Sequence, residues 1–130
     1  YVACAAHVKI VDGFITVPEM HLAIDCGYPA NPERIASQME GAAVMGMSVA
    51  LNSSITFEEG AVTQGNFYDY DVVRSLNFPR VATHIIPHGF QTPSTGVGEP
   101  GIPPVAPAIG NGIFVATGQR RRHLPIGDVV

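Results

Sequence analysis

The chain has 130 residues, of which 46% are apolar and only 14% charged, against a typical charged share of about 25%. This composition excludes a disordered tail, and the net charge of −4 argues against nucleic-acid binding, which needs a basic surface. No apolar run approaches the roughly 20 residues of a membrane span. We therefore expect a single globular domain over residues 1–130, with one face packed against another chain or against a further part of the same protein.

The first predicted element is a β-hairpin. Apolar side chains recur at every second position from Val2 to Ile10, and Asp12-Gly13 then supplies residues that accept a positive φ. The return strand is predicted from Phe14 to about Asp25. Because Pro18 has no amide hydrogen to donate, it requires an edge position or a bulge in this strand.

The clearest helix begins after Asn31, a capping residue that is followed by a proline in the first turn. Gly41 and Gly46 each weaken this helix by about 1 kcal/mol relative to alanine, so we expect them to admit the close approach of another backbone. The apolar side chains that form one stripe at helical spacing are Ile35, Met39, Ala42, Ala43, Met47, Ala50 and Leu51.

The second half of the chain predicts a short hairpin at Ile55–Gln64, a strand at Val81–Ile86 and a final helix at about Val105–Thr117. The final helix is apolar on nearly all sides, which predicts that it is buried. Between the strand and this helix, residues Pro87–Pro104 form a loop rich in glycine and proline. These elements define an α+β fold with β-hairpins, a short mixed sheet and two main helices.

The long loop carries a candidate for catalysis, Glu99. Glu99 lies within Gly96-Val97-Gly98-Glu99-Pro100-Gly101, so glycines permit a ligand to approach the backbone and Pro100 stiffens it beside the carboxylate. Loops of this length inside a compact domain are usually functional. A stiffly presented carboxylate suits a general base, whereas the alternative interpretation is a solvated turn residue.

The remaining polar residues predict no metal site. His84 and His88 are four residues apart, but Pro87 breaks any helix that would align them. The other three histidines have no ligand-like spacing. Cys4 and Cys26 are too far apart for a zinc knuckle and are predicted to be small buried apolar residues.

Several motifs together resemble the C-terminal part of the molybdenum-binding subunit of the xanthine oxidase family, in particular its isoquinoline 1-oxidoreductase and aldehyde dehydrogenase branch. The two most specific are the QMEGA run at residues 38–42 and, about 60 residues further along the chain, the GVGEPG run that opens Gly96–Gly118. The other matching segments are Asp25–Gly27, Asn66–Tyr70 and Arg122–Ile126.

The resemblance implies that Glu99 corresponds to the active-site glutamate that takes a proton from the hydroxyl on molybdenum. It also implies that Gln38 lies beside the molybdopterin cofactor, for which its amide offers two donors and an acceptor. Gly98 and Gly41 are then expected to permit close approach to the cofactor, with a turn and a helix contact as the alternative roles.

The implied activity is the oxidative hydroxylation of an aldehyde or N-heterocycle with oxygen from water. The implied cofactor is molybdenum–molybdopterin, with the cytosine dinucleotide form as one option. The partners implied are the remainder of the molybdenum subunit and a separate iron–sulfur subunit, since this chain has no cysteine cluster. The alternative from a different class is a non-catalytic binding module whose loop and apolar helix form a subunit interface.

Overall fold

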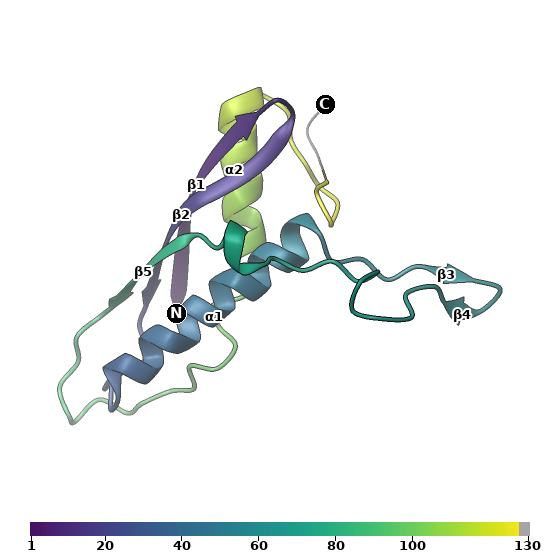
Figure 1. Cartoon of the computed structure of the whole chain (residues 1–130). Coiled ribbons are helices and arrows are strands. Elements are labelled where there is room, and N and C mark those ends of the chain that lie inside the picture. Colours follow the sequence, from purple (N-terminus) through teal and green to yellow (C-terminus); the bar gives the residue numbers. More distant parts are fainter. Residues whose placement is uncertain (128–130) are drawn as a thin grey trace.

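The computed structural model describes residues 1–127 and has two layers (Figure 1). One layer is a three-stranded sheet in the order β1-β2-β5, in which β1 and β2 are antiparallel and β2 and β5 are parallel. The other layer consists of α1 and α2. This arrangement confirms the predicted α+β class and the short mixed sheet. The bounds of these elements are Val2–Val11 for β1, Phe14–Ile24 for β2, Pro32–Leu51 for α1, Arg80–Ile85 for β5 and Val105–Thr117 for α2.

The hairpin of β1 and β2 turns at Asp12 and Gly13, whose φ angles of 51° and 84° suit the twist of the two strands. Pro18 lies at a bulge, because the register shifts between His7 and Lys9 so that one residue of β1 faces two of β2. The bulge alternative is therefore the one observed. β2 is the central strand, but β5 begins opposite Glu19, so the missing amide of Pro18 removes no hydrogen bond on that side.

Helix α1 starts as predicted, with the Asn31 side chain accepting a hydrogen bond from the Arg34 amide at 3.1 Å. The predicted stripe faces the core, and all of it except the partly buried Leu51 is buried. At Gly46 the close neighbour is the Val105 side chain, 2.6 Å from where a Cβ would lie, so the expected approach of a second backbone is wrong there. The position admits a side chain from the first turn of α2 instead.

Helix α2 ends as predicted at Gly118, which has a φ of 72°. The prediction that the whole helix is buried is wrong. Only Val105, Ile109 and Ile113 are buried, whereas Val115 is 85% exposed. The reason is that β1 and α1 cover α2 from one side, and within residues 1–127 no third layer covers the other.

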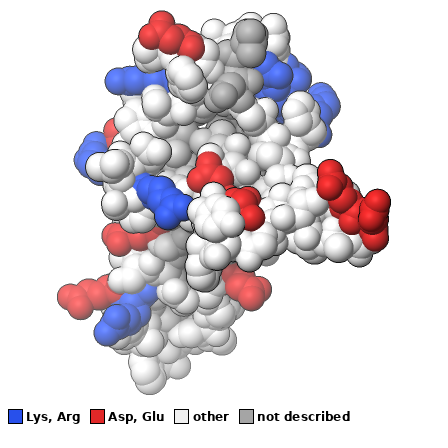
Figure 2. Space-filling view, turned by 45° about the vertical axis from the view of Figure 1, so that its right-hand side comes forward, with Lys and Arg blue, Asp and Glu red and all other residues white. Residues whose placement is uncertain are grey.

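The predicted second hairpin is present but short, with strands β3 at Phe57–Glu58 and β4 at Ala61–Val62. It forms the tip of an arm, residues 53–70, that projects away from the two layers (Figure 1). The chain then returns to the layers at Asp71 and Val73, and a short 3₁₀ helix at Ser75–Asn77 lies against β2. Phe67 in this arm is 89% exposed, and Leu76 in the 3₁₀ helix is 96% exposed. Acidic side chains gather at the end of the arm, while most of the face in Figure 2 is uncharged.

The core lies between the sheet and the two helices. Its largest fully buried side chains from the sheet are Met20, Leu22 and Ile24, and those from the helices are Met39, Ile109 and Ile113. The opposite face of the sheet carries Glu19 and His21 of β2 and Arg80 and His84 of β5. Among the helices described within residues 1–127, none is long and apolar enough to cross a membrane.

Candidate functional site

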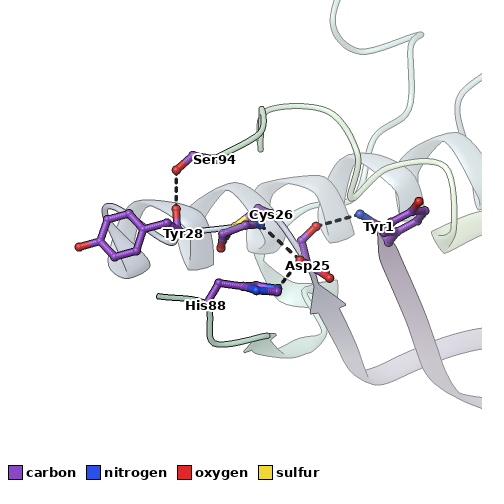
Figure 3. A network of polar contacts seen from close by, with 7 residues as sticks. Tyr1, Asp25, Cys26, Tyr28, His88 and Ser94 are labelled. Atoms are coloured by element: carbon purple, nitrogen blue, oxygen red, sulfur yellow. Dashed lines mark hydrogen bonds and ion pairs between the residues drawn. The ribbon is translucent and has the colours of Figure 1, made fainter. Parts of the chain in front are cut away.

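The loop of residues 86–104, which joins β5 to α2, is fastened at its start to the turn that follows β2. Because β2 and β5 are parallel neighbours, their carboxyl ends meet at one edge of the sheet. At this edge the His88 Nε2 atom lies 2.8 Å from Asp25 Oδ1, which also accepts a hydrogen bond from the Gly27 amide at 3.3 Å (Figure 3). The Gly27 amide and then the His88 imidazole lower the pKa of Asp25 below its ordinary value.

The next part of the loop lies directly on this turn. The Tyr28 amide donates to the Thr92 carbonyl at 3.3 Å, the Thr95 amide donates to the Cys26 carbonyl at 2.9 Å, and the Ser94 hydroxyl donates to the Tyr28 carbonyl at 2.6 Å. Gly27 has a φ of +71°, and a Cβ there would overlap the Pro93 carbonyl. The loop can therefore pack against this turn only when residue 27 is glycine.

The far end of the loop is held by α1. Gly101 is buried, and a Cβ at this position would lie 2.6 Å from the Ala42 Cβ and 3.1 Å from the Met39 sulfur. The Ile102 amide donates to the Glu99 carbonyl at 3.1 Å, which closes a turn around Pro100. The two motifs that are most specific in the sequence therefore touch each other in the fold.

This packing brings together three of the four predicted site residues. The Gln38 Nε2 atom lies 3.6 Å from where a Cβ of Gly98 would be, and Glu99 is the next residue along the loop. Both Gln38 and Glu99 are exposed. Gly41 lies apart from this group, because it lines a groove between α1 and the segment that leads into β5, and no atom lies within 4 Å of its Cβ position.

Sequence reasoning missed a second polar cluster, on the open face of the sheet. His21 Nδ1 lies 3.0 Å from His84 Nε2, and His21 Nε2 lies 3.0 Å from the Glu19 carboxylate, which also pairs with Arg80. The signal that could have found it is the parallel pairing of β2 and β5, which places these side chains on one face. Within residues 1–127 no group of three or more histidine, cysteine, aspartate or glutamate residues is placed to hold a metal ion.

The two cysteines, both predicted to be buried, differ in burial. Cys26 is buried as predicted, whereas Cys4 is half-buried. Burial raises the pKa of the Cys4 thiol. Neither cysteine forms a disulfide, and both pack with the core.

Comparison with known proteins identifies the family of the chain. Residues 1–79, more than half of the chain, match the family model of the molybdopterin cofactor-binding domain. The chain is also 34% identical over 120 residues to the membrane-bound aldehyde dehydrogenase [pyrroloquinoline-quinone] of Gluconacetobacter polyoxogenes, an alignment that covers 92% of this chain and 15% of that protein. The chain belongs to the molybdopterin cofactor-binding domain family and is part of a subunit of the xanthine oxidase family.

A second relative is the β subunit of isoquinoline 1-oxidoreductase from Brevundimonas diminuta, which is 31% identical over 129 residues covering 93% of this chain and 16% of the relative. The crystal structure of quinoline 2-oxidoreductase from Pseudomonas putida 86 has the same fold, with a TM-score of 0.81 and 19% identity over 92% of this chain and 16% of that one. The chain thus spans about one sixth of the length of these proteins. The resemblance inferred from the sequence motifs is confirmed.

The residues at the loop and α1 fit a polar cofactor of this kind. The Gln38 amide has two hydrogen-bond donors and one acceptor and is exposed to solvent. Gly98 lies beside this amide, Gly96 and Gly98 are both exposed, and no atom of the described chain lies within 4 Å of the Gly96 Cβ position. Amide donors on an uncovered backbone are suited to phosphate groups and to the edge of a pterin ring.

Proposed function

We propose that this chain forms one wall of the molybdenum cofactor site in a molybdenum hydroxylase and supplies Glu99 as the general base of the reaction. One observation carries the proposal. Gly101 packs on Met39 and Ala42, and this contact places Glu99 and Gly98 beside Gln38 although the two segments are far apart in the sequence. The family of the chain gives the cofactor that such a juxtaposition would serve.

The cofactor in this proposal is molybdenum–molybdopterin, including its cytosine dinucleotide form. When bound, it supplies the two-electron oxidising centre of the reaction. The Gln38 amide and the loop backbone at Gly98 would hold its polar edges. One relative is named for pyrroloquinoline quinone, but we favour molybdopterin because the family model that matches residues 1–79 describes a molybdopterin-binding domain.

Glu99 would accept the proton that the attacking oxygen, derived from water, loses as it bonds to the substrate carbon. Its place on the loop favours this role, because the turn closed by the Ile102 amide and the contact of Gly101 with α1 hold the backbone on its C-terminal side. A base that is already held in place avoids the entropic cost of positioning its carboxylate at each turnover. The exposed carboxylate leaves room for a substrate to approach.

We propose an aldehyde or an N-heterocycle as the substrate, because the relatives are named for aldehydes and isoquinoline. The electrons would leave through an iron–sulfur partner subunit. An iron–sulfur cluster of the common kind needs four cysteine ligands, whereas this chain has two cysteines in all. The remainder of the molybdenum subunit would complete the cofactor site and the substrate pocket.

The substitution Glu99→Gln in the complete, cofactor-loaded enzyme tests the proposal. The amide keeps the size of the side chain but cannot accept a proton, so turnover should fall by about 10²- to 10⁴-fold at unchanged molybdenum content. Glu58→Gln, on the projecting arm, is the matched control and should leave turnover unchanged. A Glu99→Gln enzyme that keeps more than about a tenth of wild-type turnover would contradict the role of general base.

A second candidate function, a non-catalytic subunit interface, is favoured by the exposed outer face of α2, where Val115 is 85% exposed. Apolar surface of this kind usually marks an interface. The two functions predict different outcomes for the same variant. If the chain were only an interface module, Glu99→Gln would leave turnover unchanged, while a charged residue at Val115 would release the partner.

A further inference from the structure

The loop that carries Glu99 is tied to the sheet by one ion pair that the mechanism above does not use. The last backbone hydrogen bond between the parallel strands runs from the Ile86 amide to the Ile24 carbonyl at 2.9 Å. Directly beyond it, His88 and Asp25 form their 2.8 Å contact, with side chains 30% and 39% exposed (Figure 3). The pair is therefore the first tie after the point where the sheet ends.

Asp25 joins two segments through a single oxygen atom. Its Oδ1 accepts from the Gly27 amide, which fixes the turn of residues 25–28, and from His88, which fixes the start of the loop. The same turn then binds residues 92–95 through the Cys26 and Tyr28 hydrogen bonds. A change at Asp25 would therefore loosen the turn that binds residues 92–95, and a change at His88 would free the start of the loop.

Only a short span separates this anchor from Glu99. The loop is held at Thr95 by the Cys26 carbonyl and at Gly101 by Met39 and Ala42. Glu99 lies on the span between these two points. The residue before it, Gly98, lies beside the Gln38 amide. The position of the carboxylate relative to Gln38 depends on both anchors.

We propose that Asp25 and His88 are positioning residues, which act on the reaction by fixing the place of Glu99. The inference rests on the proposed role of Glu99 as the base. The pair lies outside the buried core, so its loss should leave the fold and the cofactor content intact. Misplacement of a catalytic group by about 1 Å can lower the rate by about 10²-fold, so the effect should appear in kcat.

The test uses His88→Ala and His88→Gln in the complete enzyme. His88→Ala removes the donor to Asp25, so kcat should fall at least about tenfold with KM changed less than about threefold, and residues 92–101 should exchange amide hydrogens faster. Glutamine carries an N–H donor at nearly the same place as Nε2, so His88→Gln should restore both readouts to within about threefold of wild type. His7→Ala, an exposed histidine of β1, is the control and should change neither.

A double variant separates this proposal from the role of Glu99 itself. If His88 acts through Glu99, adding His88→Ala to Glu99→Gln should lower kcat by less than about twofold further, because the displaced group is already inactive. If the double variant loses the full factor of the single His88→Ala variant, the positioning role is overturned. Unchanged kcat and unchanged exchange in His88→Ala would overturn it as well.

The two proposals fail in distinguishable ways. Should Glu99→Gln keep full turnover, the role of Glu99 as base is wrong, while faster exchange of residues 92–101 in His88→Ala still shows whether the pair holds the loop. Asp25→Asn provides a milder test if His88→Ala loses cofactor. Its Oδ1 remains an acceptor but loses its charge, so exchange of the same residues should rise less than in His88→Ala and kcat should fall by a smaller factor.

Discussion

Two long irregular segments of this chain differ in how they contact the rest of the molecule. The loop of residues 86–104 lies against the rest of the molecule, fastened to the turn after β2 and to α1. The arm of residues 53–70 projects away and is held mainly by local hydrogen bonds, such as those that Asp69 accepts from the Gly65 and Asn66 amides at 2.8 and 2.9 Å. Contacts with distant residues, rather than glycine and proline content, give the loop its fixed position.

The largest effect should come from a pair of glycines, one in the turn on which the loop lies and one in the arm. Gly27 and Gly60 have φ angles of +71° and +82°, but a Cβ at Gly27 would overlap the Pro93 carbonyl, whereas nothing lies within 4 Å at Gly60. Gly27→Ala should therefore lower the free energy of local opening by about 2–5 kcal/mol, and Gly60→Ala by about 1–2 kcal/mol. Hydrogen exchange at the Thr95 and Ala61 amides measures the two. Equal costs would mean that the loop does not lie on the turn.

A smaller effect is expected at the other anchor. Gly101→Ala would place a methyl group 2.6 Å from the Ala42 Cβ, so we expect a loss of about 1–3 kcal/mol in the stability of the loop. Gly65→Ala is the matched change in the arm, where the nearest atom to the new Cβ is 3.9 Å away, and it should cost less than about 1 kcal/mol. Hydrogen exchange of residues 96–102 and 65–69 compares them. A neutral Gly101→Ala variant would contradict the packing of the loop on α1.

The smallest effect concerns the pH dependence of the two regions. Backbone amides lower the pKa of both Asp25 and Asp69, chiefly that of Gly27 for the first and that of Gly65 for the second. A carboxyl whose pKa is lower when folded stabilises the fold fully above its ordinary value of about 3.9, and this contribution is lost as the pH falls through the lowered pKa.

Acidification below about pH 4 should therefore loosen both turns, but the set of residues affected should differ between them. Hydrogen exchange, corrected for its intrinsic dependence on pH, should rise at residues 92–95 when Asp25 is protonated, but only at residues 65–66 when Asp69 is protonated. Asp69→Asn should abolish the response of the arm and leave that of the loop. A loop that stays protected while Asp25 titrates would contradict the anchoring by this carboxylate.

The local features of the fold could be predicted from the sequence because each depends on neighbouring residues. Asp12-Gly13 and the Asn31 cap determine a turn and a helix start through their own backbone and side-chain preferences. The burial of α2 could not be predicted in this way. Its apolar outer face is exposed because burial depends on what lies on the other side, and residues 1–127 contain no layer there.

The candidate site likewise has features that could be predicted from the sequence and features that could not. Motif resemblance identified Glu99, Gln38, Gly98 and Gly41 as residues of interest, but nothing in their spacing shows that Gly98 meets Gln38 while Gly41 faces a separate groove. The Asp25–His88 pair also escaped prediction. It exists because β2 and β5 are parallel neighbours, a pairing across 63 residues of sequence that periodicity does not reveal.

The most direct test of the account is an experimental structure of the complete molybdenum subunit with its cofactor bound. We predict that the Gln38 amide lies within hydrogen-bond distance of the cofactor, about 3 Å, and that the Glu99 carboxylate faces the molybdenum centre and the substrate pocket. The loop should keep its contacts with Asp25 and with α1. A cofactor bound elsewhere, with Glu99 and Gln38 facing bulk solvent, would contradict the account.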